Sequence, residues 1–312
     1  MDLQQSSFYK KYVQSIGWIV ITVDGINIYI KNIPLLGTLA KIQRPRLLPY
    51  LPKLIPFLKK YHVRKISFEP TANTDQQEYQ KMQNSISKFF ILNKEPFLPT
   101  KTIRISLIPS EETLFSSFTE AKRRAVRKAI KNNILIQKST NIKDLIDIKA
   151  KSAGMFGSIT TYGLDRLWSA FSPDNATILL AYHNTECHPE RSEGSSPDVH
   201  RKTLMDSSPD LVGIRMTCEK NKHSLVGGVL LLFFDHTAYY WIAGATRQGK
   251  KLFAPTLLVW EALKISKKRG CTMFDFVGVF DERSPKQYLS WKGFTKFKEG
   301  FGGQEVYYPI AQ

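Results

Sequence analysis

The feature that most limits what this chain can fold into is a well-delimited helix between apolar strands in its last third. Residues 225–234 and 238–245 are rich in β-forming residues and predict two strands. Pro255 suits the first turn of a helix that ends before Gly270, and residues 273–277 predict a buried strand directly after it. Strands, a helix and a further strand in this order are typical of an α+β domain.

The first third of the chain shows a similar order. A hairpin is predicted around Asp24-Gly25, a strand at 64–68, a helix at 78–90 and a closing strand at 102–107. The chain has 312 residues, 42% of them hydrophobic, which is enough for about two domains. The sequence therefore predicts two α+β halves rather than a regular alternation of parallel strands and helices.

The charge of the chain is strongly positive. Lysine and arginine number 45 against 27 aspartates and glutamates, so the net charge is +18. Such a field attracts polyanions, whether nucleic acid, anionic lipid or a diphosphate substrate. The most basic segment is the predicted helix 111–132, where Arg123 and Arg127 lie among other cations beside a narrow seam of alanines. Phosphate binding and a solvated helix face explain this segment equally well.

Several classes of protein are disfavoured. Three scattered cysteines argue against a disulfide framework and fit a reducing compartment. We see no signal peptide, and the longest apolar run, 225–234, is too short to span a membrane. Cys187-His188 lacks a second pair at ligand spacing, so no metal is expected. We therefore expect a cytoplasmic protein that at most makes peripheral contact with an anionic membrane.

The familiar motifs of covalent catalysis and phosphate transfer are missing. The sequence has no Gly-x-Ser-x-Gly, no Walker loop and no metal-binding histidine pair, so nothing supports a hydrolase or a kinase. Residues 247–251 resemble the pyrophosphate-binding loop of acetyl-CoA-dependent acetyltransferases. Leu252 stands where a second small residue is expected, which favours a degenerate copy over a working CoA site.

Aromatic residues and lysines alternate in the segment 293–303, which ends in glycines. If the segment is a strand, the alternation sorts its side chains onto opposite sides. An aromatic ring next to a lysine, as at Phe297 and Lys298, suits a terminal nucleotide, because the ring can stack and the ammonium can meet a phosphate or an oxyanion. An exposed edge strand protected by lysines explains the pattern as well.

Residues 184–210 differ from the rest of the chain. They are rich in Ser, Pro, Asp, Glu and His and show no apolar periodicity. The composition predicts a disordered loop inserted between two strands, without a functional role.

The order of these segments resembles that of the Fem family of peptidoglycan interpeptide-bridge aminoacyltransferases along nearly the whole chain. The most specific blocks are FDFVGV at 274–279 and FKEGFGG at 297–303. Other blocks are at 8–11, 34–37, 43–45, 66–70, 102–107, 123–129, 227–230, 240–245 and 258–262. The resemblance implies two tandem GNAT-like (acyl-CoA N-acyltransferase-like) domains with mixed central sheets. We place the first at 1–110 and the second at 111–302, with the C-terminal strand 303–312 able to rejoin the first.

The resemblance also implies a reaction. An amino acid would pass from aminoacyl-tRNA, as co-substrate and without a further cofactor, to an amine on the stem peptide of a lipid-linked or UDP-linked peptidoglycan precursor. By this similarity Phe297 contacts the tRNA acceptor end and Lys298 stabilises charge at the reacting ester. The cations Lys296, Arg123 and Arg127 are assigned to the tRNA.

The precursor site is matched more loosely. Lys10 falls where the family holds the diphosphate of the precursor, and Tyr239 or Tyr240 corresponds to the tyrosines that line that site. The arginine that the family places within 157–164 is missing here.

An aminoacyl ester is already activated, so an amine can attack it without a covalent enzyme intermediate. The enzyme must orient both substrates, stabilise the oxyanion and manage a proton. Asp275 is the candidate for the proton, with Asp281 and Glu282 nearby, although turn and cap roles explain these residues as well. The alternatives are a CoA-dependent N-acyltransferase and a non-catalytic relative that binds tRNA or membrane.

Overall fold

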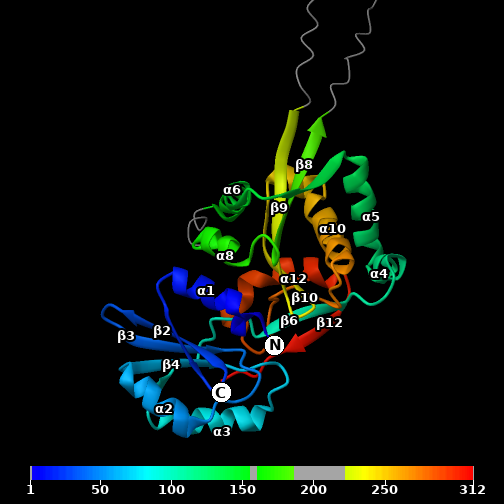
Figure 1. Cartoon of the computed structure of the whole chain (residues 1–312). Helices are drawn as coiled ribbons and strands as arrows, with labels where there is room; N and C mark the ends of the chain where they lie inside the picture. The colour runs from blue at the N-terminus through cyan, green and yellow to red at the C-terminus, as the bar shows by residue number, and fades with distance from the viewer. Residues whose placement is uncertain (1, 155–159, 186–221, 312) are drawn as a thin grey trace, which may run out of the picture.

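The computed structural model describes residues 2–154, 160–185 and 222–311 (Figure 1). Five strands near the N-terminus form one mixed sheet, in the order β1 (Ile19–Val23), β2 (Ile26–Ile33), β3 (Gly37–Gln43), β4 (Val63–Glu69) and β5 (Ile91–Leu92). The first three strands are an antiparallel meander. Strands β4 and β5 then join in parallel, because α2 (Leu51–Lys60) and α3 (Gln76–Ser87) carry the chain back before each of them.

The core of this sheet is formed by the apolar faces of α2 and α3. The helix α2 is amphipathic, and its Leu54 and Leu58 are fully buried with Ile28 and Ile66 of the strands. On α3, Ile86 and Tyr79 pack into the same cluster. Apolar residues three or four positions apart thus lie on the helix face that meets the sheet.

A second mixed sheet has seven strands. Its order is β12 (Gln304–Tyr307), β6 (Lys101–Ser106), β11 (Met273–Asp275), β10 (Thr237–Ala245), β9 (Lys222–Phe234), β8 (Ala176–Thr185) and β7 (Ile134–Ser139). Only β10 and β11 are parallel neighbours, and α9 (Arg247–Lys251) and α10 (Ala254–Lys268) make the crossover between them. The α+β class with two mixed sheets is therefore confirmed, as is the helix that begins at the proline.

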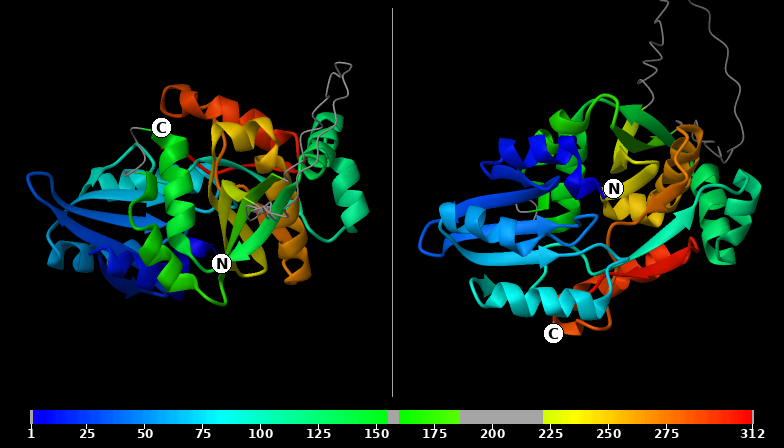
Figure 2. Two further views of the ribbon diagram at one scale, coloured as in Figure 1. Left: turned by 90° about the horizontal axis from the view of Figure 1, so that it is seen from above. Right: turned by 60° about the horizontal axis from the view of Figure 1, so that its bottom comes forward.

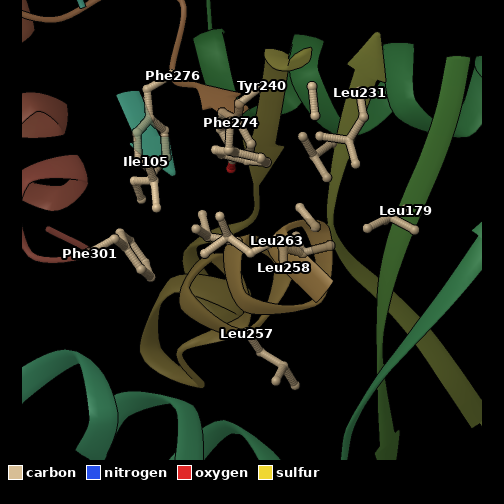
Figure 3. Packing of buried hydrophobic residues seen from close by; sticks show 14 of the residues in the cluster. Ile105, Leu179, Leu231, Tyr240, Leu257, Leu258, Leu263, Phe274, Phe276 and Phe301 are labelled. Atoms are coloured by element: carbon tan, nitrogen blue, oxygen red, sulfur yellow. The ribbon is translucent and has the colours of Figure 1, made fainter. Parts of the chain in front are cut away.

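Helices cover both faces of the second sheet (Figures 1 and 2). One face packs on α4 (Glu111–Ser117), α5 (Glu120–Lys131) and α10, and the other on α1 (Ser7–Ser15), α6 (Ile142–Ala153) and α8 (Leu164–Phe171). Neighbouring strand residues alternate between the two cores. Leu179 and Leu231 face the first core (Figure 3), whereas Leu180 and Leu230 face the second. A strand buried on both faces explains the continuous apolar run at 225–234.

The division of the chain between the two sheets does not coincide with the domain boundary expected near residue 110. Strand β6, predicted to close the first half, lies inside the second sheet between β11 and β12. The C-terminal strand β12 does return to the segment before residue 110, but it does so by pairing with β6. Pairing between distant strands has no local signal in the sequence, so the domain boundary itself stays a prediction.

Strands β8 and β9 pair antiparallel from Ala176 and Leu232 to Thr185 and Lys222. The insertion expected at 184–210 therefore begins at the end of this pair, and from residue 186 on it lies outside the described residues. No helix within the described ranges is both long and apolar enough to cross a bilayer.

Candidate active site

The parallel strands β10 and β11 separate soon after they meet. They pair only from Thr237 to Tyr239, while β10 continues along β9 to Ala245, with a bulge at Trp241. The chain after β11 follows β6 instead, because Phe276 N donates to Ile103 O and Val279 N to Lys101 O. The two strands therefore splay in the middle of the sheet. Bulges beside such irregular pairing are common next to functional sites.

A tight turn lies at this splay. Gly278 N donates to Phe276 O at 2.8 Å across Val277, whose φ is +69°. This is a γ-turn of the strained, positive-φ kind, and a β-branched residue at its centre is a clear outlier. The turn is held from one side by Asp275 Oδ1, which accepts Val277 N at 2.6 Å. Strain of this sort persists only where the surroundings enforce it, and it gathers at functional sites.

Lys298 meets this turn from the helix α12 (Lys292–Glu299). Its Nζ donates to Phe276 O at 2.9 Å and to Gly278 O at 2.6 Å, the two carbonyls that flank Val277. The ammonium also lies 4.9 Å from the centre of the Phe294 ring, one helical turn earlier. The strained turn thus points two carbonyl groups at one lysine.

The strand considered for residues 293–303 is wrong, because 292–299 form a helix. The side chains of this segment therefore do not alternate between two sides, as they would on a strand. Thr295 is buried and accepts Phe280 N through its Oγ1 at 2.7 Å, while Phe294 and Lys298 share a face at a spacing of four. The contacts of Thr295 on one face and of Lys298 on another favour the helix, although the alternating sequence is compatible with a strand.

Burial, and to a smaller extent nearby charges, shift the pKa of Lys298. Burial lowers the pKa of Lys298 to about 7, Asp275 opposes this shift, and the positive charge of Lys149 adds to it. Lys149 lies on α6, which packs so closely on β10 that a Cβ at Gly244 would be 2.8 Å from the Lys149 Cα. A lysine near its midpoint at neutral pH can act as hydrogen-bond donor or take up a proton.

Asp275 is buried and fully engaged. Its carboxylate accepts Thr102 Oγ1 at 2.6 Å and Arg104 Nε at 2.8 Å in addition to Val277 N. Both side-chain donors come from β6, about 170 residues earlier in the chain, so no local motif could have revealed them. This geometry supports a positioning role at the splay, and proton transfer by Asp275 stays a prediction.

Phe297 lies on the same helix beside the basic helix α5. Its ring packs on Phe301 with centroids 5.2 Å apart, and Lys122 Nζ lies 3.8 Å from its centre. Burial lowers the pKa of Lys122 to about 8. Sequence reasoning missed Lys122 because only the tertiary structure distinguishes it from its basic neighbours.

The other basic residues assigned to tRNA differ in their surroundings. Arg123 donates to Ser116 O and Phe118 O at 2.7 and 2.6 Å, and so caps carbonyl groups at the end of α4. Arg127 is exposed, with its guanidinium 5.7 Å from the Phe115 ring, and Lys296 is exposed on α12. Arg123 is therefore part of the scaffold, whereas Arg127 and Lys296 face solvent.

The residues assigned to the precursor are not gathered at one point. Lys10 lies on α1, with Nζ 3.5 Å from Thr22 Oγ1 of β1. Tyr239 and Tyr240 are both buried, on opposite faces of the second sheet, and burial raises the pKa of each. The centroid of the Tyr240 ring lies 5.6 Å from that of Phe276, so Tyr240 packs beside the first residue of the strained turn.

In the segment 247–251, which resembles a CoA-binding loop, Gly249 already contacts other residues of the protein. Gly249 N donates to Thr246 Oγ1 at 3.0 Å, so this amide is already capped. A Cβ at Gly249 would be 2.2 Å from Val226 O. The glycine is therefore required for close packing of α9 on β9, which explains it without a phosphate.

A helical crossover between two parallel strands that splay within a mixed sheet defines the fold as GNAT-like. The model of the FemAB family matches residues 213–308, which include the strained turn and Lys298. The fold matches the crystal structure of FemX with a TM-score of 0.68 at 14% identity, covering 98% of this chain and 90% of that one. The resemblance to the Fem family is thus confirmed.

Two further structures share the fold. One is the C-terminal domain of a putative lysylphosphatidylglycerol synthetase from Agrobacterium fabrum, with a TM-score of 0.54, 9% identity and coverage of 98% and 86%. The other is a tandem GNAT protein from the clavulanic acid biosynthesis pathway, with a TM-score of 0.50, 9% identity and coverage of 93% and 80%. The chain has no significant sequence match among curated proteins.

Proposed function

We propose that this protein is an aminoacyltransferase that moves an amino acid from aminoacyl-tRNA to an amine on the stem peptide of a peptidoglycan precursor. The observation that carries the proposal is Lys298, held at the splay by two carbonyl groups of a strained turn. The lysine and the two carbonyl groups all lie in the part of the chain that matches the FemAB family. The similarity to FemX in fold supports the same reaction class.

The chemistry requires no covalent enzyme intermediate. The acceptor amine attacks the ester carbonyl carbon, a C–N bond forms, and the tetrahedral oxyanion collapses with loss of the tRNA ribose oxygen. The amine gives up one proton and the ribose oxygen takes up one, so the reaction is balanced. The enzyme has to orient the reactants and stabilise the oxyanion.

Lys298 is suited to the second task. An ammonium has three N–H bonds, and the structure accounts for two of them at Phe276 O and Gly278 O. We assign the third to the oxyanion. Two fixed acceptors keep Nζ in one place, so little reorganisation is needed when charge develops. Asp275 acts through the turn, because it holds Val277 N and thereby the two carbonyls.

The tRNA acceptor end would approach along α12 and α5. The half-buried Phe297 beside Lys122 is our assignment for contact with a terminal base, while the exposed Lys296 and Arg127 can reach phosphates. Lys10, exposed enough to meet a diphosphate, remains our assignment for the precursor.

A transfer assay tests the proposal. Purified protein is incubated with total tRNA charged with labelled amino acids and, in parallel, with UDP-linked and lipid-linked muropeptide precursors. Label on a stem peptide establishes the reaction and names donor and acceptor. A further arm with labelled acetyl-CoA tests the competing activity. Acetyl transfer without aminoacyl transfer, from folded protein that binds tRNA, would reject the proposal.

A further inference from the structure

We infer that one end of the five-stranded sheet binds an anionic membrane surface. The parallel strands β3, β4 and β5 all begin at this end, since Thr38 pairs with Val63 and Lys65 with Ile91. The turn between β2 and β3 and the C-terminal ends of α2 and α3 lead into these strands. The hairpin projects at the left of the molecule in Figures 1 and 2. This inference does not depend on the transfer reaction.

Large apolar side chains are exposed at this end. Leu35 is fully exposed and Leu36 is 71% exposed at the tip of the hairpin, while Phe89 and Ile91 are about half exposed before and in β5. The hairpin is close to β4, because a Cβ at Gly37 would be 3.4 Å from Arg64 Cδ. A cluster of exposed apolar residues on one part of a protein marks a site of association.

The same end is strongly basic. Segments 51–65 and 85–94 carry seven lysines or arginines and no aspartate or glutamate. Lys59, Arg64 and Lys88 line an open groove of about 710 Å³ together with Phe89. The Lys59 ammonium lies 5.2 Å from the centre of the Phe89 ring. We call Leu35, Leu36, Arg64, Lys88, Phe89 and Ile91 the sheet-end patch.

This combination points to lipid rather than RNA. Single-stranded RNA is held by stacking on aromatic rings, whereas three of the four apolar residues of the sheet-end patch are aliphatic and two lie at a protruding tip. Lysines and arginines attract the anionic headgroups, and aliphatic side chains enter the boundary of the acyl region. Each contribution alone gives weak binding, so both are needed for stable attachment.

Sedimentation with lipid vesicles tests the inference. We expect the full-length protein to bind vesicles of phosphatidylglycerol and phosphatidylcholine, to bind pure phosphatidylcholine far less, and to be released by salt. The double variants Leu35→Asp/Leu36→Asp and Arg64→Glu/Lys88→Glu should each weaken binding at least about tenfold.

The matched control is Lys138→Glu/Lys268→Glu, which changes the charge equally at exposed positions on the second sheet and α10. It should stay within about threefold of the unaltered protein, because its charges lie far from the headgroups. Thermal unfolding of all three variants is measured to exclude loss of folding. Normal vesicle binding by the hairpin variant would overturn the inference, as would loss of tRNA binding by the Arg64/Lys88 variant with vesicle binding unchanged.

Discussion

The two sheets of this protein contain the same order of strand, helical crossover and parallel strand. They differ in the hydrogen-bond partners of the buried acid that ends the second strand. In each, a strand, a helical crossover and a parallel strand follow in order, and the second strand ends on a buried acid: Glu69 in β4 and Asp275 in β11. Glu69 accepts the side chain of Gln43 from the neighbouring strand β3 at 2.6 Å, and its other oxygen accepts the backbone amides of Phe97 and Leu98 after β5. Asp275 accepts Thr102 and Arg104 from β6, on the side away from β10.

The pairing of the strands at the two carboxylates differs as well. Strands β3 and β4 pair up to Gln43 and Glu69, and Arg44 N then donates to Glu69 O at 2.6 Å. Strands β10 and β11 part after three residue pairs. A buried acid needs hydrogen-bond partners, and Asp275 takes its two side-chain donors from β6, on the side away from β10. Beyond the point where β10 and β11 part, Phe276 O and Gly278 O accept Lys298 Nζ.

The largest effect is expected for Asp275→Ala, which removes the buried acid at the point where β10 and β11 part. We expect the free energy of unfolding to fall by about 3 kcal/mol, because Arg104 would be left partly buried without its partner. Urea denaturation measures this, and Asp275→Asn, which keeps the shape and an acceptor for Thr102, should lose less. A change below about 1 kcal/mol for Asp275→Ala would contradict a role in holding the strands.

Lys298→Ala tests the function of the open sheet. Transfer should fall at least about a hundredfold, the scale of one lost oxyanion donor, while the protein stays folded. The matched control is Lys292→Ala on the same helix, an exposed lysine that lies over Phe280. Single-turnover transfer rates for both variants decide the matter: near-normal transfer by Lys298→Ala would remove the basis of the proposed mechanism.

The pH dependence of stability reports the protonation of the half-buried Lys298. Its pKa is lowered from 10.5 to about 7, so between these values the unfolded state binds more protons than the folded state. Stability should therefore rise with pH across this window, by at most about 1.4 kcal/mol per pH unit for one proton. Below pH 7 both states are protonated, and this contribution stays constant.

The comparison protein for this measurement is Lys298→Met. Lys41 of β3, whose pKa burial lowers to about 8, contributes with the same sign in both proteins and cancels from the difference. The stability of the unaltered protein relative to Lys298→Met should increase between pH 7 and 10. Parallel stability curves would show that Lys298 titrates normally in the folded state.

The smallest effect is expected for Val277→Gly. Glycine adopts positive φ without strain, and this gain offsets the lost side-chain packing, so unfolding should change by less than about 1 kcal/mol. A looser turn positions Lys298 less well, and kcat rather than KM should fall about tenfold. His236→Gly, at φ +57° in the turn between β9 and β10, is the control and should leave transfer unchanged. An unaltered kcat for Val277→Gly would show that strain at the turn is unrelated to the reaction.

Prediction from the sequence succeeded where the signals are local. The helix between Pro255 and Gly270 was predicted within one residue at its start, because proline and glycine act on their own backbone. Alternating aromatic and basic residues at 293–303 were ambiguous, and the buried Thr295 together with Lys298 decided for a helix. The role of Lys298 was proposed from the family resemblance and stays a prediction. Its two carbonyl partners could not be foreseen, since they depend on a positive φ at a valine.

What the sequence by itself determined is the class of the fold, the positions of most helices and strands, the positive charge and the block that carries Lys298. Hydrophobic period, proline, glycine and net charge are local or additive properties, so they can be found along the chain. The tertiary structure alone decided that β6 and β12 join the second sheet, that Asp275 faces β6, and that Lys298 meets the turn. These contacts join residues from 20 to 204 positions apart, and their energies depend on burial that exists only once the chain is folded.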